Sequence, residues 1–138
     1  ESSLSHHIHS PLAARIGKVE KAYQLFLHAT RLDLDDYNNE ADQGLHITSM
    51  PGSWLAIVRG FAGMQVLKET LCFSPVIPQK WDSYSFKVNY LKNTLHIRVG
   101  KEIEISLTAG SKVDIQVYGH PYTLERGTEL KINMPMCQ

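Results

Sequence analysis

Residues 102–117, EIEISLTAGSKVDIQV, decide the fold of the second half of the chain. Apolar side chains take every second position, first in EIEISL and again in KVDIQV, while charged or hydroxyl side chains take the positions between them. A period of two is typical of a half-buried β-strand, which turns alternate side chains to opposite faces. The break at Ala109-Gly110-Ser111 has the composition of a hairpin-like turn. The stretch therefore predicts two strands whose apolar faces lie in a core.

The same alternation of apolar and polar residues extends in both directions over most of the chain beyond residue 68. We expect strands at Thr70–Phe73, Tyr84–Leu91, Thr94–Val99, Glu102–Leu107, Lys112–Val117, Tyr122–Leu124 and Glu129–Asn133. Hairpin-like turns fall between several of them, at Lys92-Asn93, Gly100-Lys101 and Glu125-Arg126-Gly127. Short strands with a turn signal at intervals of about 8–12 residues predict a small antiparallel β-sandwich or barrel.

Before residue 68 the apolar spacing is helical instead. Ser10-Pro11 resembles a helix start, with serine as the N-cap and proline at the first helical position. Apolar side chains then recur every three or four residues, which predicts one amphipathic helix over residues 11–31, with Leu12 and Ile16 on its apolar face. The acidic, turn-rich segment that follows, residues 32–44, is predicted to be an ordered surface loop.

A second helix is expected from about Ser53 to Val66. It is apolar on all sides, which is typical of a helix that is buried on most of its surface. Trp54 is therefore expected in a core, and Gly60 is expected where another segment packs closely. Two helices and a small sheet could hardly cover such a helix, so we expect it to come from a larger helical assembly. The chain is thus predicted to be α+β, with a helical part at 1–68 and a β-sandwich at 69–138.

Composition excludes several classes of function. The 138 residues carry 14 basic and 14 acidic side chains, so nothing in the net charge indicates a nucleic acid or an anionic membrane as partner. The chain contains no apolar run of the roughly 20 residues that span a bilayer, and its polar first residues do not resemble a signal peptide. Cys72 and Cys137 are expected to be reduced thiols of a cytoplasmic protein. His6, His7 and His9 lack an acidic or thiol partner nearby, so we expect no metal site.

Three segments, in this order and spacing, resemble glycoside hydrolase family 65. They are residues 2–5 with 9–10, residues 29–37, and residues 44–54 with 60–64, which read SSLS with HS, ATRLDLDDY, and GLHITSMPGSW with GFAGM. The resemblance covers roughly residues 1–120. The family contains inverting phosphorylases of maltose, trehalose, kojibiose and nigerose, together with some hydrolases.

The resemblance implies a fold that agrees with the pattern-based prediction. Members of the family have an (α/α)6 catalytic barrel followed by a small, jelly-roll-like C-terminal β-sandwich. Residues 1–68 are then expected to be the last helices of the barrel. The general acid of the family is a glutamate upstream of the matched segments, and Glu1 does not correspond to it. The chain is therefore expected to contain no catalytic residue and to be inactive as an isolated fragment.

The resemblance also implies the chemistry of the parent enzyme. An upstream glutamate protonates the leaving oxygen of an α-glucoside such as maltose, and inorganic phosphate attacks the anomeric carbon from the opposite face. The products are β-glucose 1-phosphate and glucose. Ser2, Ser3 and His46 match the family's phosphate-binding residues, and hydroxyl and imidazolium groups suit a phosphate. Without the resemblance, the serines would be interpreted as a frayed terminus and His46 as a loop residue. Phosphate is a co-substrate, and no cofactor is expected.

Two other functions compete with this one. The first is part of a family hydrolase of the trehalase type, which uses water in place of phosphate. The second is a non-catalytic β-sandwich that supports a barrel or binds carbohydrate, with Tyr118 and Tyr122 as the candidate exposed aromatics. The resemblance also suggests a homodimer.

Overall fold

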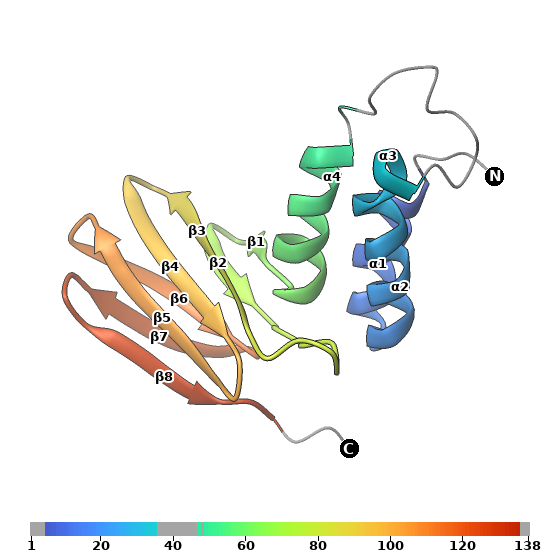
Figure 1. Ribbon diagram of the computed structural model, residues 1–138. Helices are drawn as coiled ribbons and strands as arrows, with labels where there is room; N and C mark the ends of the chain where they lie inside the picture. Colours follow the sequence, from blue (N-terminus) through green and yellow to red (C-terminus); the bar gives the residue numbers. More distant parts are fainter. Residues whose placement is uncertain (1–4, 36–46, 48, 136–138) are drawn as a thin grey trace. The chain divides into compact units, whose positions relative to one another are not determined.

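The computed structural model describes residues 5–35, 47 and 49–135, and the chain divides into two compact units, 1–63 and 64–138. The first unit is helical and the second consists of β-strands (Figure 1), so the chain has the predicted α+β character. The helical unit contains α1 (His6–Arg15), α2 (Val19–Thr30), α3 (Leu32–Asp35), α4 (Ser49–Leu55) and the π-helix η2 (Ala56–Phe61).

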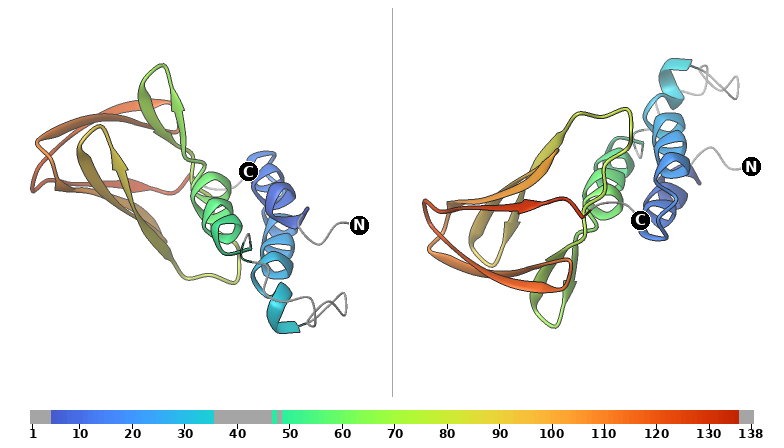
Figure 2. Two further views of the ribbon diagram at one scale, coloured as in Figure 1. Left: turned by 90° about the horizontal axis from the view of Figure 1, so that it is seen from above. Right: turned by 90° about the horizontal axis from the view of Figure 1, so that it is seen from below.

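The prediction of one helix over residues 11–31 is wrong. The chain reverses direction after Arg15, and α1 and α2 pack side by side as a hairpin (Figure 1 and Figure 2). Gly17 lies at this reversal with φ of 78°, a left-handed conformation that glycine adopts without steric cost. The backbone N–H groups of Gly17 and Lys18 donate to Ala14 and Ala13, which closes the end of α1.

Ser10 is inside α1 and does not cap a helix. Its side chain is completely buried, and its hydroxyl donates to the carbonyl oxygen of Ala22 in α2 at 2.9 Å. Pro11 likewise lies inside α1 instead of at its first position. The pair therefore lies at a contact between helices, where a small polar residue allows close packing.

Replacing Ser10 by alanine should destabilise the helical unit by about 1 kcal/mol, because the buried hydrogen bond that joins α1 to α2 is lost. Urea unfolding followed by far-ultraviolet circular dichroism measures the change. The matched control is the exposed neighbouring variant His9→Ala, for which we expect a change within about 0.5 kcal/mol. Equal stabilities for the two variants would show that the hydroxyl contributes nothing to the helix pairing.

The second predicted helix begins earlier and ends earlier than expected. α4 starts at Ser49 and continues directly into η2, where the Ala62 N–H donates to the carbonyl of Ile57 five residues back. The helix ends at Phe61 because Gly63 takes φ of 59° and residues 65–67 form a strand. The predicted boundary at residue 68 therefore lies inside the second unit.

Burial on this helix is one-sided within the described residues. Phe61 is fully buried and packs edge-on against Phe26, with ring centroids 5.8 Å apart. A Cβ built on Gly60 would lie 2.9 Å from the Cα of Pro11, which confirms the expected close approach. Trp54, however, is 47 % exposed, so the prediction that it lies in a core is not met within this chain.

α1 also presents an apolar stripe to solvent. Ile8, Leu12 and Ile16 follow one another at intervals of four residues and are 66 %, 51 % and 70 % exposed. Leu12 and Ile16 were predicted on the apolar face of a helix, and that face is exposed within the described residues. The described helices thus leave apolar surface of the kind that usually marks an interface.

The second unit is a sandwich of two four-stranded sheets (Figure 2). One sheet has the order β1-β2-β6-β7 and the other has the order β3-β4-β5-β8. The strands are β1 (Gln65–Leu67), β2 (Thr70–Phe73), β3 (Tyr84–Tyr90), β4 (Asn93–Val99), β5 (Glu102–Ala109), β6 (Lys112–Val117), β7 (His120–Glu125) and β8 (Glu129–Asn133). All seven predicted strands are present, and β1 was missed.

Two details of the predicted topology are wrong. β2 and β6 pair in parallel, whereas every other pairing is antiparallel. The connections at residues 110–111 and 126–128 do not close hairpins, because β5 and β6 belong to different sheets, as do β7 and β8. Gly110 takes φ of 101°, and a Cβ there would lie 2.0 Å from Oδ1 of Asn93. The crossing between sheets therefore requires glycine at this position.

The sandwich core is made by the alternating apolar side chains of both sheets. Ile97, Ile103 and Ile105 of one sheet are at most 1 % exposed. Leu71 and Ile115 of the other sheet are also only 1 % exposed. Three of the true hairpins, β1–β2, β3–β4 and β6–β7, have tight turns with left-handed backbone at non-glycine residues. These residues are Lys68 and Glu69, Leu91 and Lys92, and Tyr118, which is followed by Gly119.

Two tyrosines fasten the connection between β2 and β3. The Tyr84 hydroxyl donates to the carbonyl oxygen of Val76 at 2.9 Å, and the Tyr118 hydroxyl donates to that of Pro75. Trp81 packs edge-on against Tyr84 with ring centroids 5.6 Å apart. Burial raises the pKa of the Tyr84 phenol well above its usual 10, and the nearby Tyr118 adds to this shift.

This pKa shift predicts a loss of stability in alkali. The unfolded chain ionises Tyr84 above pH about 10, whereas the folded chain keeps it protonated. The stabilisation is therefore fully present below that pH, and it decreases by up to about 1.4 kcal/mol per pH unit above it. Urea midpoints between pH about 8 and about 11 should fall more steeply for the wild type than for Tyr84→Phe. Parallel curves for the two proteins would contradict the assignment.

Candidate functional site

The residues predicted to bind phosphate, Ser2, Ser3 and His46, all lie outside the described residues. The helices that follow them in the chain are described. Ser3 lies three residues before His6, the first residue of α1, and His46 lies three residues before Ser49, the first residue of α4. The site can therefore be approached from the first turns of these two helices.

The first turns of α1 and α4 are in direct contact. A Cβ built on Gly52 of α4 would lie 2.6 Å from Cγ, 2.8 Å from Nδ1 and 2.9 Å from Cβ of His7 in α1. Further along the chain, Pro11 of α1 meets Gly60 of η2. Both contacts advance in the same chain direction, so α1 runs parallel to α4 and η2 (Figure 1). The two helices consequently begin at the same end of the pair.

The first turns of α1 and α4 contain no acidic residue. A helix start carries partial positive charge from its unpaired backbone N–H groups, and two parallel helices place two such charges together. The sequence did not predict the contact between His7 and Gly52. The sequence feature that could have indicated this contact is Gly52 itself, because the first turn of a helix ordinarily tolerates a side chain.

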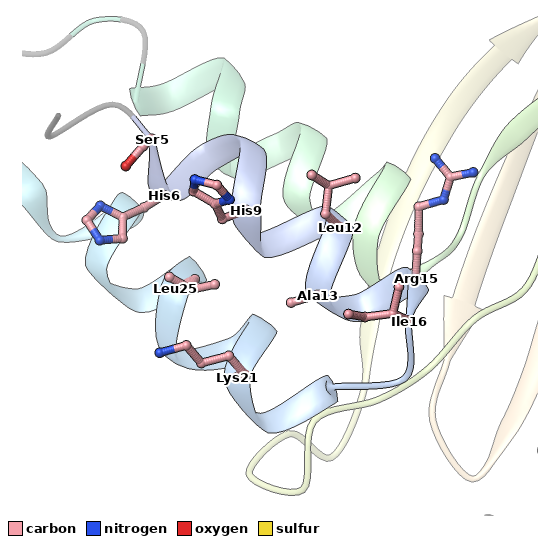
Figure 3. A pocket seen from close by; sticks show the side chains of 9 residues that line it. All are labelled: Ser5, His6, His9, Leu12, Ala13, Arg15, Ile16, Lys21 and Leu25. Carbon is pink, nitrogen blue, oxygen red and sulfur yellow. The ribbon is translucent and has the colours of Figure 1, made fainter. Parts of the chain in front are cut away.

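A groove of about 830 Å³ lies between α1 and α2 in the helical unit (Figure 3). His6, His9, Arg15 and Lys21 line it together with apolar side chains that include Leu12, and no carboxylate is among its described lining residues. His6 stacks on His28 with ring centroids 5.5 Å apart. The groove shares Leu12 and Ile16 with the exposed stripe of α1. It suits an apolar segment that carries negative charge.

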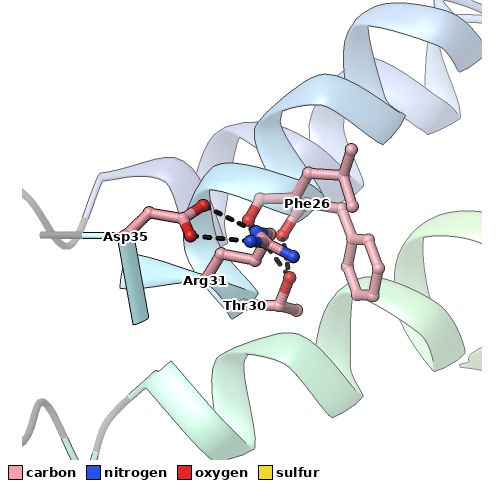
Figure 4. A network of polar contacts seen from close by, with 5 residues as sticks. Phe26, Thr30, Arg31 and Asp35 are labelled. Carbon is pink, nitrogen blue, oxygen red and sulfur yellow. Dashed lines mark hydrogen bonds and ion pairs between the residues drawn. The ribbon is translucent and has the colours of Figure 1, made fainter. Parts of the chain in front are cut away.

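The acidic segment begins as a helix and not as a loop. Leu32–Asp35 form α3, and Arg31 donates to both carboxylate oxygens of Asp35 at 2.6 Å and 2.7 Å (Figure 4). The Thr30 hydroxyl donates to the carbonyl oxygens of Phe26 and Leu27 within the last turn of α2. The rest of the segment that was predicted to be a loop, residues 36–44, lies outside the described residues. Asp35 thus takes part in an exposed ion pair that fixes the end of α2.

The outer face of the β3-β4-β5-β8 sheet carries a row of charges. Glu104 pairs with Arg98 at 3.4 Å and with Lys131 at 3.8 Å, and Lys131 also contacts Glu129 at 3.4 Å. The hydrogen bond to Glu129 and the charges of both glutamates raise the pKa of Lys131. All four side chains are partly or largely exposed, so the row serves solubility more than stability.

The tyrosines considered for sugar binding are half-buried. Tyr118 uses its hydroxyl to hold Pro75, and that hydroxyl also lies 3.6 Å from the sulfur of Met134. Tyr122 is half-buried on β7, and the neighbouring His120 is exposed. Tyr118 therefore has a packing role, which does not favour an aromatic platform for sugar.

Other classes of site were also sought within the described ranges. No group of three or more His, Cys, Asp or Glu side chains in them is arranged to hold a metal ion. Cys72 is a free, buried thiol. No helix among the residues that the structure describes is long and apolar enough to cross a membrane.

Comparison with known protein families gives two matches along the chain. Residues 1–55 match the glycosyl hydrolase family 65 central catalytic domain, and residues 64–124 match the glycosyl hydrolase family 65 C-terminal domain. The two matches fall on the helical unit and on the sandwich, respectively.

Individual relatives agree with these matches. The chain is 47 % identical over 126 residues to maltose phosphorylase of Bacillus subtilis and 39 % identical over 133 residues to α,α-trehalose phosphorylase of Geobacillus stearothermophilus. These alignments cover 91 % and 96 % of this chain but 17 % of each relative. A solved structure of a human-microbiome protein assigned as a kojibiose phosphorylase superposes with a TM-score of 0.87 at 39 % identity. It covers 96 % of this chain, which in turn spans 18 % of that protein.

Proposed function

The chain belongs to glycosyl hydrolase family 65, and from this premise we propose that it is the C-terminal part of an inverting disaccharide phosphorylase. The observation that carries the proposal is the 47 % identity to a maltose phosphorylase over 91 % of the chain. In the intact enzyme, an α-glucoside such as maltose reacts with inorganic phosphate to give β-glucose 1-phosphate and glucose. Phosphate takes the place that an activated water has in inverting hydrolases.

We propose Ser2, Ser3 and His46 as phosphate ligands of the intact enzyme. Their hydroxyl and imidazole groups donate hydrogen bonds to phosphate oxygens, and a protonated imidazole adds positive charge. The contact between His7 and Gly52 supports this proposal, because it brings together the helices that follow the two ligand segments. The absence of acidic residues from the first turns of both helices also favours bound phosphate.

The helical unit would form the last helices of an (α/α)6 barrel. Its parallel pair of α1 and α4–η2, with α2 packed against α1 in the opposite sense, is compatible with alternating barrel helices. The exposed stripe of Ile8, Leu12 and Ile16 and the cationic groove beside it would then pack against upstream helices of the same enzyme. Since the general acid lies upstream as well, the 138 residues alone would be inactive.

The sandwich would support the barrel and not bind carbohydrate itself. Tyr118 is committed to holding the connection between the two sheets, and the outer face of one sheet is a row of paired charges. The intact enzyme is proposed to be cytoplasmic, to use no cofactor, and to form a homodimer.

The experiment that tests the function is the phosphate dependence of sugar turnover by the intact enzyme. We expect glucose release from maltose to require inorganic phosphate and to yield β-glucose 1-phosphate in equal amount. Turnover without phosphate would identify a hydrolase of the trehalase type. Phosphate-dependent turnover of trehalose or kojibiose in place of maltose would keep the reaction class and change the substrate.

A further inference from the structure

The groove between α1 and α2 follows one face of each helix (Figure 3). On α1, His9, Leu12 and Ile16 follow one another at intervals of three or four residues, so their side chains share a face. Lys21 and Leu25 are four residues apart on α2 and share a face in the same way. The groove therefore runs along the helix pair for about two helical turns. A third helix that lies along a pair of helices needs a groove of this kind.

The apolar part of the groove is open in the described structure. Leu12 is 51 % exposed and Ile16 is 70 % exposed, and Ile8 extends the same stripe toward the start of α1 with 66 % exposure. One exposed apolar residue is ordinary on a protein surface, but a row of three on one helix face indicates a surface that another element covers. Removing this apolar area from water would drive the packing of that element.

Lys21 is a cation in an unfavourable place on its own helix. It is the third residue of α2, where the helix dipole favours an acidic side chain. Glu20 is the acidic residue of this first turn, and it is not among the lining residues of the groove. No Asp or Glu lines the groove within the described ranges. The charge of Lys21 is therefore suited to a carboxylate that comes from outside α1 and α2.

We propose that this groove binds an amphipathic helix of the same polypeptide, from the part that precedes these 138 residues. Its apolar side chains cover Leu12 and Ile16, and one of its carboxylates lies beside Lys21. The inference rests on the proposed function, since it takes the chain to be the C-terminal part of a longer enzyme.

Two observations support an occupant from the same polypeptide. The chain covers only 17 % of the maltose phosphorylase and of the trehalose phosphorylase that it matches, so relatives of this kind have a long polypeptide that can supply the helix. A second copy of the chain suits the groove less well. A two-fold dimer through this face would place a cationic surface that lacks carboxylates against a copy of itself.

The test is a photo-crosslink in the intact enzyme with the variant Leu12→benzoylphenylalanine. We expect the main crosslinked product to keep the mass of one polypeptide. Mass spectrometry should join position 12 to a peptide from before Glu1 that has helically spaced apolar residues and an Asp or Glu. Ile16→benzoylphenylalanine repeats the measurement if the first variant does not fold. The control is Lys87→benzoylphenylalanine on the exposed face of β3, which should not capture the same peptide.

The charge is tested separately with Lys21→Glu. Glutamate suits the start of α2, so a loss of stability in this variant comes from contacts outside that helix. We expect the thermal midpoint of the intact enzyme to fall by at least about 3 °C. The midpoint should recover when the carboxylate of the captured peptide is changed to lysine in the same protein. Lys18→Glu is the matched control, because Lys18 is exposed and does not line the groove, and its midpoint should change by less than about 1 °C.

The possible results separate the occupants. A crosslinked product with twice the polypeptide mass would place a second copy in the groove and overturn the proposal. A crosslink that is absent, or confined to these 138 residues, would overturn it as well. Equal midpoints for Lys21→Glu and Lys18→Glu would remove the carboxylate and contradict the proposed chemistry of the occupant. These measurements do not depend on turnover, so their failure is distinct from a failure of phosphate dependence, which tests the proposed function.

Discussion

Replacing Ser2 and Ser3 together by alanine should lower kcat/KM for phosphate in the intact enzyme by about 10²- to 10⁴-fold. Each hydroxyl is proposed to donate a hydrogen bond to an anion, and bonds of this kind contribute about 1.5–3 kcal/mol each. Since 1.36 kcal/mol corresponds to a tenfold change in rate, two such bonds give the stated range. His46→Ala should have an effect of similar size to one serine. Steady-state rates at varied phosphate and fixed saturating maltose measure these effects.

The matched controls are Ser106→Ala and His120→Ala, which change the same residue types on the sandwich. Neither should alter the phosphate kinetics. His46→Gln distinguishes the role of charge from that of hydrogen bonding, because glutamine can donate but carries no charge. A serine double variant with unchanged kcat/KM for phosphate would remove these residues from the site and leave the family assignment intact.

The Ile105→Ala variant should destabilise the sandwich by about 2–5 kcal/mol, the usual cost of truncating a large aliphatic core residue to alanine. Ile105 is completely buried in β5, and it pairs in register with Ile97 of β4 and Leu130 of β8. The cavity would therefore open between three neighbouring strands. Urea unfolding followed by Trp81 fluorescence reports on this unit when Trp54 is replaced by phenylalanine in every protein compared.

Ser106→Ala is the control for this variant, because it alters the next residue of the same strand on the opposite face. Its effect should be within about 0.5 kcal/mol. The two variants should share the slope of the unfolding transition and differ only in its midpoint. A loss below about 1 kcal/mol for Ile105→Ala would mean that the core collapses around the truncated side chain.

The strands were predictable because each one carries its own signal. Alternation shows which residues of a strand face the core, and the burial of Ile103, Ile105 and Leu107 agrees with it. Alternation does not say which strand lies beside which. The parallel pairing of β2 with β6 and the crossing at Gly110 depend on residues far apart in sequence, so the expected hairpins there were wrong.

The helical unit was less predictable, because its local sequence pattern does not show where one helix ends and the next begins. Ile16 and Val19 keep the apolar spacing across the reversal at Gly17, so the pattern continues although the helix does not. Serine is a common N-cap residue, but Ser10 instead lies buried inside α1 and donates a hydrogen bond to the carbonyl oxygen of Ala22. For the site, the proposed ligands Ser2, Ser3 and His46 rest on the family resemblance. The contact of His7 with Gly52 joins residues 45 positions apart, which no local pattern reveals.

The tight turns of the sandwich bear on how such a sequence changes in evolution. Lys68, Glu69, Leu91 and Lys92 hold left-handed backbone that asparagine and glycine adopt at lower cost. Residues with a Cβ lose about 1 kcal/mol each in this conformation. The sandwich therefore lies below its attainable stability, and each of these turns is one or two substitutions away from a more favourable sequence. Stabilising substitutions in these turns can therefore compensate for destabilising substitutions that are selected elsewhere for function.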